Sequence, residues 1–375
     1  MPSIRIPYTS PFPVPRVIPP SAQELPGAIA ALTEFLTSAK TTGSKRGTVC
    51  LTGAGISVAS GLNDYRGIAG AYIVNKSFRP IYYNEFLDGH AFRKRYWARS
   101  YVGWPGLRAK GPNSVHHLIK RLGELEIFRS VITQNVDSFH QIHPSLPTVE
   151  LHGFLRSAIC ITCGTYHPRD EFQDQLSALN PAWADFVNQM IASGAISTED
   201  PTIQKDRGLR TNPDGDIDIP GASYSTFRYP ACPTCLRKPP TLPNGQQGRI
   251  DIDQDGAWLE SSDAGILKPA VVMFGEGIKT EVKDAAEAAI DGADRVLVIG
   301  SSLATYSAWR LAKRAVDMGM PLGILNLGGT RGEEAFFERI SGEGKERTSV
   351  RINLDAAEVL PPVVKAIESQ RSGKN

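Results

Sequence analysis

Four short apolar runs along the chain each end in glycine or in small polar residues. They cover residues 48–51, 131–132, 296–299 and 324–325. Short apolar runs bounded by turn residues are typical of strands buried on both faces of a parallel sheet. Segments with helical patterns lie beside them, at residues 28–40, 114–125, 281–290 and 307–318, and can supply the crossovers. The pattern predicts an α/β fold with a doubly wound, Rossmann-like parallel sheet.

Polar and glycine-rich segments follow all four predicted strands. Because the carboxyl ends of parallel strands share one edge of a sheet, these segments are expected to meet in one crevice. A final helix is predicted from residue 355 towards 369, interrupted at Pro361 and Pro362.

The stretch from 154 to 263 has few apolar runs and many turn residues, which indicates a smaller inserted module with loops. Residues 240–263 within it offer little to bury and are expected to be mobile. The parallel-sheet domain is then assigned to residues 27–153 and 264–375, with a helical excursion at 73–110. Seven prolines in the first 20 residues predict a flexible arm over residues 1–26.

Composition narrows the class of protein. The 375 residues include 41% hydrophobic residues and carry a formal charge of +2, so the charge balance gives no support for a nucleic-acid partner. No apolar run approaches the ~18 residues that span a bilayer, so no membrane partner is expected. The oligomeric state cannot be inferred from the sequence.

The cysteines form two identical C-x-x-C pairs, Cys160 with Cys163 and Cys232 with Cys235. Four thiolates can fill the tetrahedral shell of one structural Zn²⁺, and so few cysteines favour a reducing compartment. The pairs are separated by 68 residues, residues 164–231, far more than in an ordinary zinc ribbon. Reduced thiols or a redox pair remain the alternatives, and Cys50 is expected to be a core thiol.

The segment Gly53-Ala54-Gly55-Ile56-Ser57 follows the first predicted strand and can bring backbone N–H groups close to a pyrophosphate. The third glycine of the usual G-x-G-x-x-G pattern is replaced by Val58. A simple tight turn is therefore an equal alternative from these residues alone.

Several further motifs resemble those of the sirtuin family, in the order in which the family carries them. They are Asp64-Tyr65-Arg66, Thr133-Gln134-Asn135-Val136-Asp137, Leu151-His152-Gly153, residues 271–276 and Gly300-Ser301-Ser302. The resemblance covers about residues 28–360, and the two cysteine pairs fall where the family has its zinc. Residues 95–105 look most like the class II branch that includes the vertebrate mitochondrial sirtuin four type. Asn63 departs from the proline that many relatives carry.

The resemblance implies an NAD-dependent protein-lysine deacylase. Such an enzyme consumes NAD, releases nicotinamide and transfers the acyl group from lysine to ADP-ribose. A protein mono-ADP-ribosyltransferase and a non-catalytic NAD-sensing module are the alternatives. The resemblance and the basic, acid-free residues 1–23 indicate the mitochondrial matrix, with cytoplasm or nucleus as alternatives.

The resemblance also implies roles for single residues. His152 matches the general base, and Asn135 and Asp137 match residues at the nicotinamide end, although a lone histidine is more often structural. The cofactor-binding set is Gly53, Ala54, Gly55, Ser57, Asp64, Tyr65, Arg66, Gln134, Asn135, Asp137, Gly300, Ser301, Ser302, Asn326, Leu327, Gly328 and Ala356.

The substrate contacts are the last group that the resemblance implies. Val272, Phe274, Gly275 and Glu276 match an edge that captures an extended acyl-lysine peptide by strand addition. Tyr96 and Arg99 have the spacing with which family members recognise acidic acyl groups. A solvated basic helix face, formed by residues 93–95 and Arg99, is the alternative.

Overall fold

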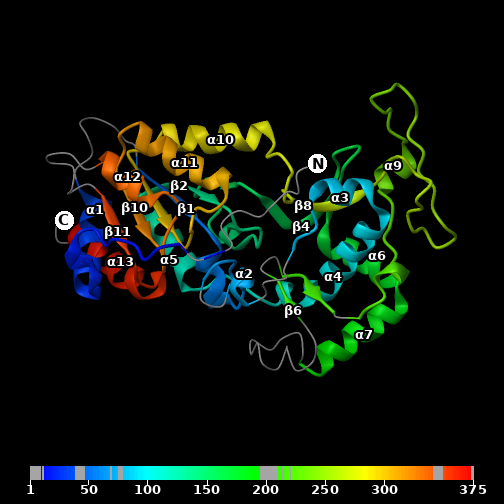
Figure 1. The fold of residues 1–375 in the computed structure, drawn as a ribbon, viewed down its shortest axis with the longest axis horizontal. Helices are drawn as coiled ribbons and strands as arrows, with labels where there is room; N and C mark the ends of the chain where they lie inside the picture. The colour runs from blue at the N-terminus through cyan, green and yellow to red at the C-terminus, as the bar shows by residue number, and fades with distance from the viewer. Residues whose placement is uncertain are drawn as a thin grey trace.

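The computed structural model describes residues 10, 12–38, 47–67, 70–74, 79–194, 210–212, 215–219, 221–340 and 349–372. These residues form a large region built on a parallel sheet and a smaller region that contains the cysteine pairs (Figure 1). Among the described helices, none combines the length and the hydropathy that crossing a bilayer requires.

The large region contains a six-stranded sheet in the order β11-β10-β9-β1-β2-β3, in which all neighbouring strands are parallel. Its strands are β1 (Thr48–Thr52), β2 (Phe128–Thr133), β3 (Thr148–Glu150), β9 (Arg295–Ile299), β10 (Leu322–Leu325) and β11 (Val350–Ile352). The predicted α/β fold is confirmed. The chain builds β1 to β3 in one direction and β9 to β11 in the other, so the topological switch point lies between β1 and β9.

Helices cover both faces of this sheet because alternate strand residues face opposite sides. Cys50 and Val131 pack with helices α1 (Leu25–Thr37), α5 (Ser114–Glu124) and α13 (Ala356–Ser372). Val49 and Val298 pack with α10 (Thr280–Asp291), α11 (Tyr306–Asp317) and α12 (Glu333–Ile340). Burial also raises the pKa of the Cys50 thiol, as expected for a core residue.

The interruption predicted in the last helix is wrong, because α13 runs through both Pro361 and Pro362. Two missing N–H donors cost hydrogen bonds, but Val359, Leu360 and Val363 on the same helix are fully buried in the core. Tertiary packing therefore holds the helix where local propensity would end it.

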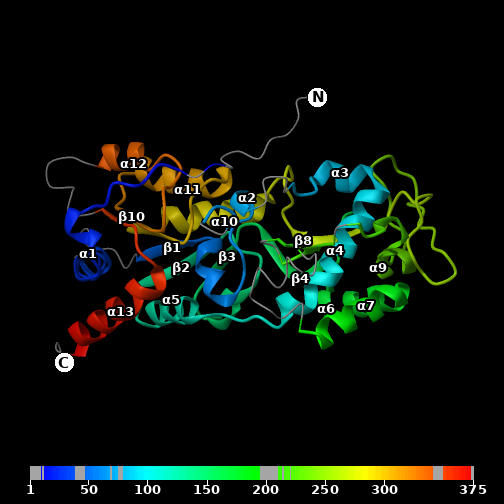
Figure 2. The same ribbon diagram turned by 60° about the horizontal axis from the view of Figure 1, so that its bottom comes forward.

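The smaller region has a core of its own. An antiparallel sheet of β5 (Tyr166–Pro168), β4 (Gly153–Cys160) and β8 (Leu267–Val271) lies against α4 (His90–Arg108) and α6 (Arg169–Leu179) (Figure 2). Trp97 of α4 packs on Phe172 of α6, with ring centroids 4.5 Å apart. The helical excursion at 73–110 thus shares the core of the cysteine-containing region.

The remaining elements are short. They are η1 (Pro20–Gln23), η2 (Ala54–Ser60), α2 (Ala71–Val74), α3 (Tyr83–Asp88), η3 (Phe139–Ile142), α7 (Pro181–Ala192), β6 (Arg210–Thr211), β7 (Ile217–Asp218), η4 (Tyr224–Thr226) and α9 (Pro233–Arg237).

Described parts of two segments that we expected to be loose are packed against the rest of the protein. Within residues 240–263, Trp258 is 3% exposed, stacks on Tyr229 and donates from Nε1 to the carbonyl of Ala264 at 2.9 Å, so this stretch does have a side chain to bury. In the expected N-terminal arm, Ala22 is fully buried and α1 already begins at Leu25.

Candidate active site

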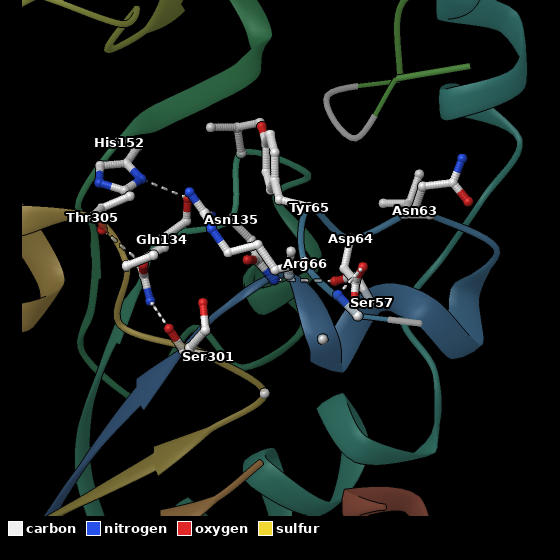
Figure 3. Close-up of a pocket in the computed structure, with 18 of the residues that line it drawn as sticks. Ser57, Asn63, Asp64, Tyr65, Arg66, Gln134, Asn135, His152, Ser301 and Thr305 are labelled. Atoms are coloured by element: carbon white, nitrogen blue, oxygen red, sulfur yellow. Dashed lines mark hydrogen bonds between the residues drawn. The ribbon is translucent and has the colours of Figure 1, made fainter. Parts of the chain in front are cut away.

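A cleft of about 890 Å³ lies at the carboxyl ends of the strands and extends to the smaller region. Its walls come from both loops at the switch point, from the segments after β2 and β3, and from α4 and the segment after β8. This volume is in the upper part of the ~300–1,000 Å³ range of small-molecule sites, so it suits an extended ligand. Figure 3 draws residues that line it and labels ten of them.

Glycines allow the two switch-point loops to pack together. The Gly53 N–H donates to the carbonyl of Ile299 at 3.1 Å, and the Gly55 N–H donates to that of Gly300 at 2.9 Å. A Cβ on Gly53 would lie 2.7 Å from the Gly300 oxygen, which no real contact tolerates. Gly300 itself has φ +61°, a conformation that favours glycine. Close loop packing therefore explains these glycines without a ligand.

His152 is held between two polar groups that define its tautomer. Its Nδ1 lies 3.0 Å from the carbonyl oxygen of Gln134, which can only accept, so Nδ1 carries the proton. Its Nε2 then accepts from the Ser307 hydroxyl at 2.8 Å. Burial lowers the pKa of His152 to about 4. The imidazole is therefore neutral near pH 7, with a basic lone pair on Nε2.

Gln134 connects the segment after β2 to the segment after β9 (Figure 3). Its Nε2 donates to Ser301 Oγ at 2.7 Å, and its Oε1 accepts from Thr305 Oγ1 at 3.1 Å. Because the Gln134 carbonyl also holds His152, one residue fixes the wall that contains the imidazole.

Asn135, Ser57 and Asp137 form a second hydrogen-bonded group. Asn135 Nδ2 donates to Ser57 Oγ at 3.1 Å, and Ser57 Oγ donates to Asp137 Oδ2 at 2.7 Å. The other carboxylate oxygen of Asp137 accepts from the N–H of Phe139, the first residue of η3, at 2.9 Å. Burial raises the pKa of Asp137. The same side chain thus forms an Asx turn before η3 and lines the cleft.

The segment with Asp64, Tyr65 and Arg66 lies on the cleft wall near the glycine loop. Asp64 Oδ1 accepts from the Gly67 N–H at 2.9 Å, and burial raises the pKa of Asp64. The Arg66 guanidinium lies 4.9 Å from the ring centre of Tyr72, and burial lowers the pKa of Arg66.

The far end of the cleft is formed by the loop after β10. Arg351 of β11 is fully buried and donates from Nη1 to the carbonyl of Asn326 at 3.0 Å and from Nη2 to that of Gly328. Gly328 also donates its N–H to Asn353 Oδ1 at 2.8 Å. The loop is thereby tied to β11.

The segment after β8 borders the same cleft from the other side. The Val272 N–H donates to the carbonyl of His152 at 2.8 Å, which joins this segment to the histidine. Lys268 Nζ pairs with Glu276 Oε2 at 3.0 Å, and that oxygen also accepts from the N–H of Met273 at 2.9 Å. Gly275 makes the turn between them, with φ +84°.

Tyr96 and Arg99 of α4 also line the cleft. Arg99 is 5% exposed, which contradicts a solvated position for this member of the basic face, whereas Arg95 does remain half exposed. The Nη2 atom of Arg99 lies 2.7 Å from Oδ2 of Asp216, which also lines the cleft. Asp216 is held in turn by Asn212 Nδ2 at 2.6 Å. The buried guanidinium charge is therefore offset.

The structure brings most of the expected site residues into one cleft. The lining includes Ala54, Gly55, Ser57, Asp64, Tyr65, Arg66, Gln134, Asn135, Asp137, His152, Gly300, Ser301, Ser302, Asn326, Leu327, Gly328 and Ala356, with Tyr96, Arg99, Val272, Phe274 and Glu276 of the substrate set. Gly53 and Gly275 lie next to it in the chain. Phe12, Asp216, Thr305 and Ser307 also line it, and sequence analysis missed them because no motif marks them.

The four cysteines gather away from the cleft. Cys160 Sγ lies 3.6 Å from Cys235 Sγ, and Cys163 Sγ lies 3.7 Å from Cys232 Sγ. All four sulfurs are within 4.8 Å of one another. Tetrahedral Zn²⁺ with Zn–S bonds of about 2.3 Å requires sulfurs about 3.8 Å apart. The donor set therefore fits one structural zinc, with no ligand position left for chemistry.

Comparison with known proteins identifies the family. Residues 53–307 match the model of the Sir2 family. The chain belongs to the Sir2 family. It is 38% identical over 327 residues to the NAD-dependent protein deacylase SIR4 of Batrachochytrium dendrobatidis, covering 85% of this chain and 90% of that one. It is 33% identical to the NAD-dependent protein deacylase Sirt4 of Drosophila melanogaster, covering 80% of each.

Solved sirtuin structures share the fold. A Sir2 complex with a deacetylated p53 peptide and 3'-O-acetyl ADP-ribose has a TM-score of 0.57 and 22% identity, covering 90% of this chain and 98% of that one. A Sir2 complex with a p53 peptide and NAD⁺ has a TM-score of 0.51 and 21% identity, covering 92% and 98%. With the family thus established, this sirtuin is an NAD-dependent protein deacylase, and NAD is its consumed co-substrate.

Proposed function

We propose that this sirtuin transfers an acyl group from a protein lysine to ADP-ribose within the cleft, with His152 as the general base. The observation that carries this proposal is the tautomer of His152. Because Nδ1 donates to the Gln134 carbonyl, the lone pair is on Nε2, next to Ser307. A neutral imidazole held in one orientation can take a proton from a hydroxyl group beside it.

NAD bound in this cleft supplies a glycosidic bond that breaks as nicotinamide leaves and an ADP-ribose that accepts the acyl group. The residues of the chain bind, orient and move a proton. Asn135 and Asp137 would hold the carboxamide of nicotinamide, and His152 Nε2 would take a proton from a ribose hydroxyl. Gln134 would orient the ribose from the adjacent wall.

The remaining NAD contacts follow from the positions of the loops. The N–H groups of Ala54, Ser301 and Ser302 would hold the pyrophosphate, since backbone N–H groups at such loops favour anionic oxygens. The glycines beside them, whose own N–H groups bond to carbonyls, would let the ligand approach the backbone closely. The guanidinium of Arg66 would also contact the pyrophosphate. Asn326, Leu327, Gly328 and Ala356 would contact the adenosine.

The second substrate is an acylated lysine in a protein or peptide. Two of the similar solved structures contain p53 peptides. In this chain, the segment after β8 borders the cleft beside His152 and includes Val272, Phe274, Gly275 and Glu276. Main-chain pairing to this segment would give affinity with little sequence preference. The acyl chain would extend towards Tyr96 and Arg99.

A mitochondrial location is part of the proposal. It is supported by the likeness to Sirt4 of Drosophila and by Arg5 and Arg16 in an acid-free stretch over residues 1–23. Imaging of the full chain with a C-terminal tag tests it, and a nuclear or cytosolic signal contradicts it.

The reaction itself is tested with purified protein, NAD and a panel of acetyl, lipoyl, glutaryl and long-chain lysine peptides. Nicotinamide release that requires the acylated peptide, with acyl-ADP-ribose as the second product, supports the proposal. Absence of release with every acyl chain contradicts it. Label from NAD that appears on a protein acceptor instead identifies ADP-ribosyl transfer.

A further inference from the structure

The N-terminal segment from Phe12 to Ile18 reaches the NAD cleft that we propose above. Ile18 and Arg351 exchange two backbone hydrogen bonds, of 3.0 and 2.8 Å, and so the segment is fixed beside the edge strand β11. Pro15 is buried, and Phe12 lines the cleft. Part of a segment at the start of the chain thus forms a wall of the site.

Arg351 connects this segment to the loop at the far end of the cleft. Its backbone pairs with Ile18, while its buried guanidinium donates to the carbonyls of Asn326 and Gly328. Glu333 Oε2 accepts from Arg351 Nε at 2.9 Å and offsets the charge. A single fully buried residue therefore sets the position of the segment relative to the loop.

Gly329 provides the space in which the two meet. A Cβ at this position would lie 2.1 Å from the carbonyl oxygen of Pro13 and 2.7 Å from Cβ of Phe12. Only glycine allows this approach of backbone to backbone. Pro13 and Pro15 restrict the segment before it docks, which reduces the entropy lost when it is ordered.

We propose that Phe12 is part of the dinucleotide site and contacts the adenosine moiety of the bound ligand. The inference rests on the proposed function, because it assumes that NAD occupies this cleft with its adenosine at Asn326 to Gly328. An aromatic side chain at the end of a cleft, beside the loop after β10, suits a purine base. Aromatic contacts with nucleobases stabilise binding substantially.

The test measures binding of ADP-ribose by calorimetry to the full chain, without any turnover. Phe12→Ala should weaken this binding about 5-fold to 100-fold, the range expected for loss of an aromatic contact with a base. Gly329→Ala should weaken it as well, because the added Cβ displaces the segment while Phe12 is retained. The KM for NAD should rise in both variants, while the KM for the acylated peptide should not.

Val14→Ala is the matched control, since Val14 is in the same segment and 89% exposed. It should bind ADP-ribose as the unmodified protein does. If the unmodified protein binds ADP-ribose and both Phe12→Ala and Gly329→Ala bind it equally well, the inference is wrong while the cleft assignment stands. If the unmodified protein binds neither ADP-ribose nor NAD, the proposed function itself fails.

Discussion

At the scale of single residues, the proposed chemistry depends on the ring of His152. His152→Ala removes the base and should lower kcat by about 100-fold to 10,000-fold, the usual contribution of general acid–base catalysis. ADP-ribose affinity and zinc content should change little, because the substitution leaves the loops at both ends of the cleft intact. Steady-state kinetics and calorimetry on the same preparation measure both quantities.

His117→Ala is a suitable control for this substitution, since His117 is exposed on α5 and does not line the cleft. Its kcat should equal that of the unmodified protein. Near-normal turnover by His152→Ala would exclude the imidazole as the base.

Asp216 determines how much positive charge Arg99 offers to an acyl chain. The pair is 2.7 Å apart, and both side chains are less than a tenth exposed. Asp216→Asn removes a buried negative charge. We compare kcat/KM for a glutaryl-lysine peptide with kcat/KM for the same peptide whose acyl chain ends in a neutral amide. The substitution should raise this glutaryl to amide ratio by about tenfold or more. The reason is that like charges in contact cost several kcal/mol, and about 1.4 kcal/mol corresponds to tenfold.

The matched control is Asp218→Asn, two residues along the same segment and outside the cleft, where Asp218 lies 3.8 Å from the half-exposed Arg95. It makes the same charge change without altering the cleft, so the glutaryl to amide ratio should stay constant. An unchanged ratio in Asp216→Asn would show that the acyl end does not reach Arg99.

At the scale of elements, the zinc cluster joins β4 to α9. Cys160 ends β4, whereas Cys235 lies in α9. Cys232→Ser should release zinc and lower the melting temperature, because ligand binding energy contributes to folding. Metal analysis and thermal unfolding measure these effects.

The buried Cys50 lies in β1 and provides the control for that experiment. Cys50→Ser should keep one zinc per chain even where it loses stability, since its sulfur is not in the cluster. Full zinc content in Cys232→Ser would contradict the assignment of the four ligands.

The elements also show what the sequence could and could not predict. The sequence could predict that Gln134 and Ser301, which follow two parallel strands, lie close together. The reason is that the carboxyl ends of parallel strands share one edge of the sheet. The sequence could not predict the positions of Phe12 and Asp216, because tertiary packing alone places an N-terminal segment and a turn of the inserted region at the cleft. The course of α13 through Pro361 was missed for the same reason, since core burial overrode local propensity.

At the scale of the whole molecule, three buried histidines behind the cleft make stability depend on pH. His140 Nδ1 lies 2.9 Å from His143 Nε2, and the rings of His140 and His116 are 5.3 Å apart. Burial lowers the pKa of His116 to about 4 and lowers the pKa values of His140 and His143. The unfolded chain therefore binds protons more readily than the folded chain.

Because these folded-state pKa values are depressed, the stability that neutral histidines contribute is fully present above about pH 6.5. It should be lost as the pH falls towards 4, at up to about 1.4 kcal/mol per pH unit for a buried histidine. Denaturant unfolding between pH 7.5 and 5 should show this slope, and His140→Gln should make it shallower. His117→Gln should leave it unchanged, and a pH-independent free energy of unfolding would contradict the argument.

The most direct test of the whole account is a crystal structure of the protein with NAD and an acyl-lysine peptide bound together. The account predicts NAD along the cleft, with His152 Nε2 within hydrogen-bonding distance of a ribose hydroxyl and adenosine at the loop after β10. NAD bound outside the cleft, or a ribose distant from His152, would contradict it.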